Sequence, residues 1–185
     1  MSGDWRTRAR GLRDPFERKM FVAGILEAGL RARGERPVVV GGLAVEWHSR
    51  GLYQSADIDL LCPSGPLDEV LTAMGFTKEG RHWFDAELGV AIEAPGRALE
   101  AYRDRTIQVQ TPGGTVTLVS VEESILDRLR ACVHWNSALD GEQALHMMVV
   151  QRDTIDWAYL EGRSARDQVT EKWAELRKRA EAVAE

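Results

Sequence analysis

The pattern that most restricts how this chain can fold lies in residues 37–62: three consecutive valines, a Gly-Gly pair, a segment of helix-forming residues, then Asp-Ile-Asp-Leu-Leu. The valine run, residues 38–40, is short, β-branched and bounded by proline and glycine, which is typical of a buried strand. Residues 43–50 favour a helix, and Gly51 predicts where it ends. The sequence therefore predicts a strand, a tight turn, a helix and a second strand.

Asp57 and Asp59 are two positions apart on the second predicted strand, so their side chains point to the same face. Two carboxylates about 7 Å apart repel by roughly 0.6 kcal/mol in bulk water and by roughly 2–3 kcal/mol in a protein surface cleft. A bound dication would reverse the sign of that interaction. Mg²⁺ prefers one or two carboxylates plus substrate phosphates, and a paired-metal site needs a ligand that can bridge both ions. The alternative is an exposed strand with a solvated acidic face.

The glycine pair Gly41-Gly42 immediately precedes the predicted helix. The first N–H groups of a helix have no partner within it, so a triphosphate could lie against them. An ordinary Gly-Gly turn is the alternative. The two motifs in this order are far more specific than either alone, because single short motifs often match by chance.

These residues resemble the nucleotidyltransferase superfamily, which has the DNA polymerase beta-like fold. The signature of that family is an apolar strand, Gly-Gly or Gly-Ser, a spacer, and Asp-apolar-Asp-apolar; this chain has Gly41-Gly42, a spacer of 14 residues, and Asp57-Ile58-Asp59-Leu60. The segment Gly41-Gly42-Leu43-Ala44 is similar to the minimal bacterial nucleotidyltransferase-like proteins, including the toxin-like branch associated with abortive infection. The resemblance extends over roughly residues 37–150.

The resemblance implies a third acidic residue from a later strand of the same sheet. In the predicted strand 88–94, Val90 and Ile92 face one way and Glu93 the other, so Glu93 is the best-placed match. Asp85 and Glu87 are the alternatives. The resemblance thus assigns Asp57, Asp59 and Glu93 as catalytic and metal-binding residues.

The resemblance also suggests residues that contact the nucleotide. Gly41 and Gly42 are expected at the phosphates, and Arg128, the basic residue of a Leu-x-Asp-Arg-Leu helix, is expected to reach one. An Arg128 paired with Asp127 or Glu123 on a solvated face is the alternative. Many active transferases carry a phosphate-binding Ser where this chain has Leu43, so Leu43→Ser is expected to strengthen nucleotide binding.

The rest of the chain predicts an α/β (α+β) fold in which helices flank a small mixed sheet, followed by a helical C-terminal portion. Residues 1–13 carry four arginines and few apolar residues, which favours a loose basic tail. Asp14 and Pro15 predict a helix start, and Ser120 with Glu123 predicts a capping box. The expected divisions are therefore the tail at 1–13, a nucleotidyltransferase-like core at 14–119 and a helical region at 120–185.

Composition excludes several other classes. A charged share of 29% and an apolar share of 44% in 185 residues are those of a globular protein, and the net charge of −5 argues against broad nucleic-acid binding. Cys62 and Cys132 do not make a disulfide framework, and we find neither a signal peptide nor an 18-residue apolar run, so a cytoplasmic protein without a membrane partner is expected. Zinc-ligand spacings, a Walker A loop and a Gly-x-Ser-x-Gly motif are absent from the sequence.

Two functions remain open. The first is a Mg²⁺-dependent enzyme that moves a nucleoside monophosphate from a nucleoside triphosphate such as ATP to an acceptor hydroxyl, on a tRNA end, a protein or a small molecule, and releases pyrophosphate. The second is a catalytically weak binding or regulatory module of the same fold, such as a toxin–antitoxin component with a cognate protein partner. The presence of all three carboxylates favours the enzyme.

Overall fold

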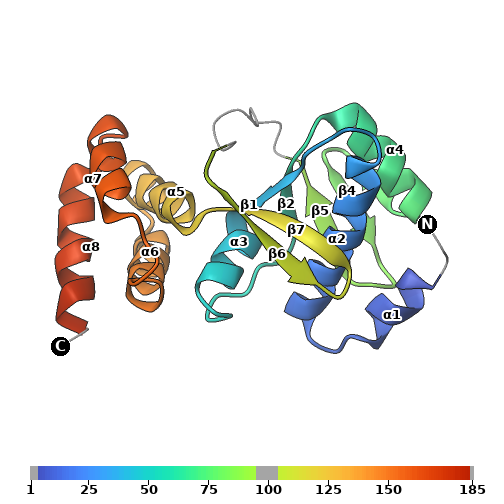
Figure 1. Ribbon diagram of the computed structural model, residues 1–185, viewed down its shortest axis with the longest axis horizontal. Helices are drawn as coiled ribbons and strands as arrows, with labels where there is room; N and C mark the ends of the chain where they lie inside the picture. Colours follow the sequence, from blue (N-terminus) through green and yellow to red (C-terminus); the bar gives the residue numbers. More distant parts are fainter. Residues whose placement is uncertain (1–3, 95–103, 184–185) are drawn as a thin grey trace. The chain divides into compact units, whose positions relative to one another are not determined.

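A computed structural model of the chain describes residues 4–94 and 104–183. Contacts divide the chain into two compact units, one of residues 1–43 and 54–119 and the other of residues 44–53 and 120–185. Figure 1 labels the helices and strands.

A mixed sheet of seven strands, in the order β3-β4-β5-β2-β1-β7-β6, forms the centre of the first unit. β1 pairs antiparallel with β2 and parallel with β7, and β2 pairs parallel with β5. The small mixed sheet predicted from the sequence is confirmed. The strands are β1 Val38–Val40, β2 Ile58–Leu61, β3 Thr77–Glu79, β4 His82–Asp85, β5 Val90–Glu93, β6 Thr106–Thr111 and β7 Gly114–Val119.

The strand register places polar residues in one row across the sheet. Asp59 of β2 lies opposite Val40 of β1 and Glu93 of β5, and Glu93 lies opposite His82 of β4. Residues that face one another on neighbouring strands project to the same side of a sheet, so Asp59, Glu93 and His82 share a face. The next row, which contains Ile58, Ile92 and Trp83, projects to the other face and is buried.

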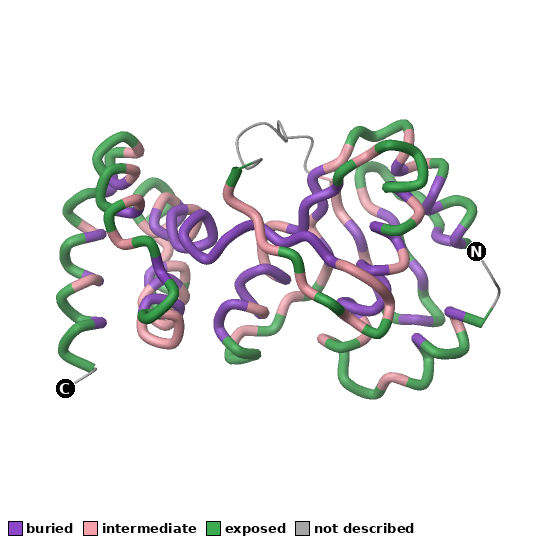
Figure 2. Tube along the Cα trace, in the orientation of Figure 1, coloured by how far each residue is buried: buried purple, intermediate pink, exposed green. Residues whose placement is uncertain are grey.

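Within the described residues of the first unit, four helices begin: α1 Trp5–Gly11, α2 Pro15–Arg31, α3 Gly41–His48 and α4 Ser64–Met74. The Asp14 side chain accepts a hydrogen bond from the Phe16 N–H at 2.8 Å, and Pro15 occupies the first helical position of α2, as the sequence predicts. α2 packs against β7, α4 and α1. Figure 2 shows buried residues along β1 and the second half of β7, where the core of this unit lies.

Helix α2 approaches the turn between β6 and β7 very closely. A Cβ atom at Gly24 would lie 2.8 Å from the backbone carbon of Gly113 and 2.9 Å from the Gly114 nitrogen. Real Cβ atoms essentially never come that close to backbone, so this contact requires glycine at position 24.

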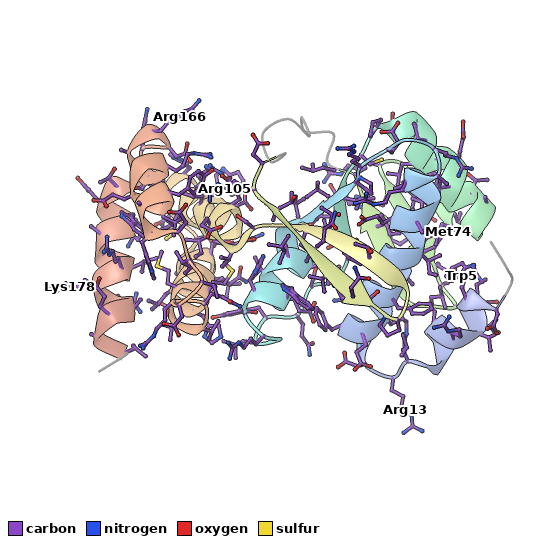
Figure 3. The ribbon with its side chains drawn as sticks, in the orientation of Figure 1. Trp5, Arg13, Met74, Arg105, Arg166 and Lys178 are labelled. Carbon is purple, nitrogen blue, oxygen red and sulfur yellow. The ribbon has the colours of Figure 1, made fainter. Side chains whose placement is uncertain are left out.

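The N-terminal segment differs from the expected loose tail. Residues 5–11 form α1, whose Trp5 and Ala9, one turn apart, are buried. Arg6 donates a hydrogen bond to the Met74 carbonyl at 2.6 Å and pairs with Asp85 at 2.5 Å. Figure 3 labels Trp5 and Met74, and shows Arg13 extending away from the fold. One Trp and one Ala at helical spacing suffice to dock this short helix; residues 1–3 lie outside the described residues.

The second unit is helical, as predicted for the C-terminal portion. Its helices are α5 Val121–His134, α6 Ala138–Val150, α7 Trp157–Arg166 and α8 Thr170–Val183, drawn yellow to red in Figure 1. The Ser120 side chain accepts a hydrogen bond from the Glu123 N–H at 3.5 Å at the start of α5. The core of the unit includes Ile125, Leu126, Leu129, Met147, Met148, Leu160, Trp173 and Leu176.

A buried charged network joins α5 to α7 within this unit. Glu123, 1% exposed, accepts hydrogen bonds from Tyr159 and, at 2.6 Å, from Arg163. Burial, and then the hydrogen bond to Glu123, raise the pKa of Tyr159 above its ordinary value. Asp167 pairs with both Arg163 and Arg130. Every charge in the network therefore has a partner of opposite sign.

Both cysteines are free thiols. No helix within residues 4–94 or 104–183 combines the length and the apolar character needed to cross a membrane.

Candidate active site

Three carboxylates come together around the neighbouring strands β2 and β5, in the middle of the sheet. Asp57, Asp59 and Glu93 each offer a carboxylate oxygen, and these oxygens lie within 4.8 Å of one another. Asp59 and Glu93 are direct neighbours on the parallel strands β2 and β5, and Asp57 lies two positions before Asp59. The structure thus brings together the three residues that the sequence assigned to a metal site.

The electrostatics of this cluster fit a divalent cation. The three residues are partly buried, and the Glu93 side chain is only 14% exposed. Two like charges 4.8 Å apart repel by about 3–4 kcal/mol at the effective dielectric constant of a protein surface. Carboxylate oxygens are the ligands that Mg²⁺ and Ca²⁺ take in proteins, so Asp57, Asp59 and Glu93 could hold such an ion.

The glycine pair lies against this cluster. Gly41 has φ +60, and a Cβ atom there would overlap the Asp59 carboxylate. The Gly42 N–H donates to Asp59 Oδ2 at 3.3 Å, and a Cβ at Gly42 would lie 2.5 Å from Ser55 Oγ. Both glycines therefore permit close contact with the acidic segment, and their expected contact with phosphates stays a prediction.

Arg81 and His82 also contact Glu93, which the sequence reasoning missed. Arg81 Nε lies 3.0 Å from Glu93 Oε1, and His82 Nδ1 lies 3.6 Å from Glu93 Oε2. The Arg81 side chain is 70% exposed, whereas the Glu93 side chain is 14% exposed. Glu93 therefore faces the other two carboxylates while one of its oxygens is paired with a solvent-exposed arginine.

Asp85 and Glu87, the alternatives to Glu93, lie in a different arrangement. Asp85 is buried, pairs with Arg6 and accepts hydrogen bonds from the N–H groups of Glu87 and Leu88 at 3.1 and 3.0 Å. Glu87 lies within 3.7 Å of Arg6 and of Arg10. These two carboxylates anchor the N-terminal helix.

Leu43 does not face a ligand site, contrary to the expectation behind Leu43→Ser. Its side chain is 0% exposed and is among the largest fully buried side chains of the described chain. A leucine in this position fills the core, so a serine there would bury a hydroxyl.

Arg128 belongs to α5 of the second unit. Its guanidinium pairs with Asp140 at 2.7 Å and with Asp127 at 3.5 Å. The pair with Asp127 is one of the alternatives expected from the sequence. A contact between Arg128 and phosphate stays a prediction.

Ser55 and Lys19 are further residues near the site that the sequence reasoning missed. The Ser55 hydroxyl donates to the Asp57 carbonyl at 2.9 Å, and the Lys19 ammonium donates to the Ser55 carbonyl at 2.5 Å. The available signals were a serine two positions before Asp57, and a lysine directly before the apolar run of residues 20–23 in α2.

Comparisons with known proteins agree with this architecture. No protein-family model matches the sequence, and no curated protein matches it significantly. The crystal structure of an antigenic nucleotidyltransferase-like protein from Paracoccidioides brasiliensis is similar over 74% of this chain and 76% of that chain, with a TM-score of 0.56 and 14% sequence identity. The chain therefore has the nucleotidyltransferase-like fold.

Two structures of the antibiotic-resistance factor ANT(2″)-Ia are similar at lower TM-scores. The solution structure has a TM-score of 0.49 at 16% identity over 89% of this chain and 94% of that chain. The crystal structure in complex with adenylyl-2″-tobramycin has a TM-score of 0.47 at 18% identity over 86% of this chain and 97% of that chain. A shared fold at such identities does not carry an activity with it, which must be argued from the site.

Proposed function

We propose that this protein is a Mg²⁺-dependent nucleotidyltransferase, which moves a nucleoside monophosphate from a nucleoside triphosphate to an acceptor hydroxyl and releases pyrophosphate. The observation that carries the proposal is the convergence of Asp57, Asp59 and Glu93 within 4.8 Å, beside the Gly-Gly pair that begins α3, on a nucleotidyltransferase-like fold. An acidic cluster alone would be weaker support, because exposed acidic groups are common without a metal.

Asp57 and Asp59 are proposed to hold the cation, with Glu93 either completing the site or accepting the proton of the acceptor hydroxyl. A divalent cation there supplies charge neutralisation for the triphosphate and the leaving pyrophosphate. The acceptor oxygen forms a bond to the α-phosphorus, and the bond from that phosphorus to the oxygen bridging to the β-phosphate breaks. The proton of the acceptor passes to the carboxylate, and pyrophosphate leaves with the electron pair of the broken bond.

The sheet explains why these roles can divide among the three residues. Asp57 and Asp59 come from one short segment, whereas Glu93 comes from the neighbouring strand and is held by the β2–β5 register. Glu93→Gln should therefore leave nucleotide binding nearly unchanged and reduce turnover by roughly 10²–10⁴, the usual range for a positioned general base.

The binding-module alternative has one observation in its favour. Arg81 Nε lies 3.0 Å from Glu93 Oε1, and a carboxylate oxygen that is held by a guanidinium is not available to an acceptor hydroxyl or a cation. Arg81→Ala separates the two functions, because in an enzyme it frees Glu93 and preserves or increases turnover. In a binding module neither the wild type nor Arg81→Ala turns over.

The decisive experiment incubates the protein and Mg²⁺ with each α-labelled nucleoside triphosphate and cell extract, then measures transferred label and pyrophosphate. The matched control is the double variant Asp57→Asn with Asp59→Asn, which keeps side-chain size and removes two negative charges. Label on an extract component with the wild type, absent with the double variant, supports the enzyme and identifies the acceptor. Thermal stabilisation by Mg²⁺ and nucleotide without transfer would favour the binding module, and stabilisation that persists in the double variant would refute the site.

A further inference from the structure

We infer that Ser55 is a positioning residue whose hydroxyl sets the orientation of the Asp57 carboxylate, and that Lys19 holds the backbone of Ser55 for this purpose. The inference rests on the proposed function, since it assigns these two residues to the same metal site. It concerns residues of this chain that lie outside the acidic cluster itself.

The hydroxyl of Ser55 contacts Asp57 at three atoms. It donates to the Asp57 carbonyl at 2.9 Å, lies 3.4 Å from the Asp57 N–H as acceptor, and lies 3.5 Å from Asp57 Oδ1. A hydroxyl has one hydrogen, and the 2.9 Å contact places it on the Asp57 carbonyl, so Ser55 positions the Asp57 carboxylate mainly by holding the Asp57 backbone. Mg²⁺ requires nearly ideal octahedral geometry, so a small rotation of this carboxylate would matter for binding.

The same hydroxyl lies directly against Gly42, the second residue of α3. A Cβ at Gly42 would come within 2.5 Å of Ser55 Oγ, and the Gly42 N–H donates to Asp59. Ser55 is thus packed between the segment that carries Asp57 and the start of α3, whose Gly42 contacts Asp59. An isolated serine turn on a surface would not make the second contact.

Lys19 fixes the backbone of Ser55. Lys19 is only 4% exposed and is followed in α2 by four buried apolar residues, yet it carries an ammonium group, which is costly to bury unless it is hydrogen-bonded. That ammonium donates to the Ser55 carbonyl at 2.5 Å. The contact attaches the loop before β2 to helix α2, a rigid element, which is how a site gains a fixed geometry.

The test compares Ser55→Ala with Ser55→Thr, and uses Ser64→Ala, an exposed serine of α4, as the matched control. The readouts on the full chain are Mg²⁺ and Ca²⁺ affinities by calorimetry, and hydrogen exchange of residues 54–59 without metal. Ser55→Ala should weaken Mg²⁺ binding by about 2–10-fold, the equivalent of one ordinary intramolecular hydrogen bond. Because Ca²⁺ accepts looser geometry, Ca²⁺ affinity should fall less, and Ser55→Thr should recover most of the Mg²⁺ affinity.

The exchange measurement separates this inference from the proposed function. Faster exchange of residues 54–59 in Ser55→Ala, without change in Ser64→Ala, supports the positioning role of Ser55. A wild type that does not bind a metal would refute the proposed function, but it would leave this exchange result in force. Unchanged exchange in Ser55→Ala would overturn the inference. Equal losses of Mg²⁺ and Ca²⁺ affinity together with a lower melting temperature would also overturn it, because Ser55 would then stabilise the fold without orienting Asp57.

Lys19→Met provides a second, independent variant, with Lys78→Met on β3 as its control. It should shift Mg²⁺ over Ca²⁺ selectivity in the same direction as Ser55→Ala. Because both residues act on one loop, the double variant should lose less Mg²⁺ affinity than the two single losses combined. Fully additive losses would show that Lys19 acts elsewhere.

Discussion

At the scale of single residues, Leu43 shows how a family signature and a packing requirement can compete for one position. The resemblance suggested that serine here would add a phosphate contact, but the side chain is fully buried. The third position of the Gly-Gly-Leu-Ala segment therefore serves the core.

We expect Leu43→Ser to lower the free energy of unfolding by about 3–5 kcal/mol, because it leaves a cavity and buries a hydroxyl. Urea unfolding measures this effect. Leu52→Ser is the matched control, since Leu52 is 58% exposed and should change stability by less than about 0.5 kcal/mol. A stable Leu43→Ser variant with tighter nucleotide binding would restore the original expectation.

Gly41 allows a second prediction at this scale. Both Gly41 and Gly34 have positive φ, +60 and +83, but only at Gly41 would a Cβ overlap the Asp59 carboxylate. Gly41→Ala and Gly34→Ala should share a backbone penalty of about 1 kcal/mol. Gly41→Ala alone should also weaken Mg²⁺ binding by at least about tenfold, because Asp59 must move. Equal metal affinities in the two variants would contradict the close-contact role of Gly41.

At the scale of helices and strands, α1 depends on a charge contact distant in the sequence. Arg6 pairs with the buried Asp85 of β4 and donates a hydrogen bond to the carbonyl of Met74, the last residue of α4. Arg6→Ala should destabilise the protein by about 2–4 kcal/mol, since it leaves a buried carboxylate without its cation. Arg13→Ala, which removes an exposed arginine, is the control and should be neutral in thermal unfolding. Equal melting temperatures would mean that α1 is only loosely attached.

The contact between α5 and α7 predicts a pH dependence. The pKa of Tyr159 is raised in the folded protein, so folding favours the neutral phenol. The contribution of this phenol to the free energy of unfolding is therefore complete below pH 10 and is lost as the pH rises through the pKa of Tyr159 in the folded protein. The difference in unfolding free energy between the wild type and Tyr159→Phe should therefore fall above pH 10. Tyr53→Phe, which lies outside this network, provides the baseline. A difference that stays constant to pH 11 would contradict this account.

The starts of helices α2 and α5 could be predicted from a few neighbouring residues. Asp14 with Pro15 predicted the start of α2, and Ser120 with Glu123 predicted that of α5, because a helix cap involves only neighbours in the sequence. Helix α1 could not be predicted in this way. Its stabilising partners, Asp85 and the Met74 carbonyl, are brought close only by the folded sheet and α4.

At the scale of the whole molecule, the same distinction applies to the site. Alternation along one segment predicted that the Asp57 and Asp59 side chains lie together, and the family resemblance suggested Glu93, on a later strand, as their neighbour. Arg81 could not be predicted, because its contact with Glu93 depends on the β4–β5 register, and Ser55 and Lys19 depend on how α2 packs. Contacts between residues far apart in the chain cannot be predicted from the pattern of a single sequence.

The packing of α2 against the β6–β7 turn predicts how the first unit folds. β1 pairs with β7 through Val39 and Leu118, and Gly24 contacts the backbone of Gly113. We expect the amides of α2 and β7 to gain protection in the same kinetic phase of refolding, because the close contact between them forms only when both elements are in place. Pulsed hydrogen exchange with mass spectrometry measures this, with α5 of the second unit as the internal comparison. Protection of α2 well before β7 would contradict it.

The close contact between α2 and the β6–β7 turn also has a consequence during synthesis. The chain is made from its N-terminus, and at roughly 5–20 residues per second the ribosome needs about 4–16 s to proceed from the end of α2 to the turn. For that interval the apolar side of α2, with Phe21, Leu26 and Leu30, has no strand β7 to cover it. The nascent chain should therefore be a chaperone client, prone to aggregate when translation stalls between residues 31 and 111.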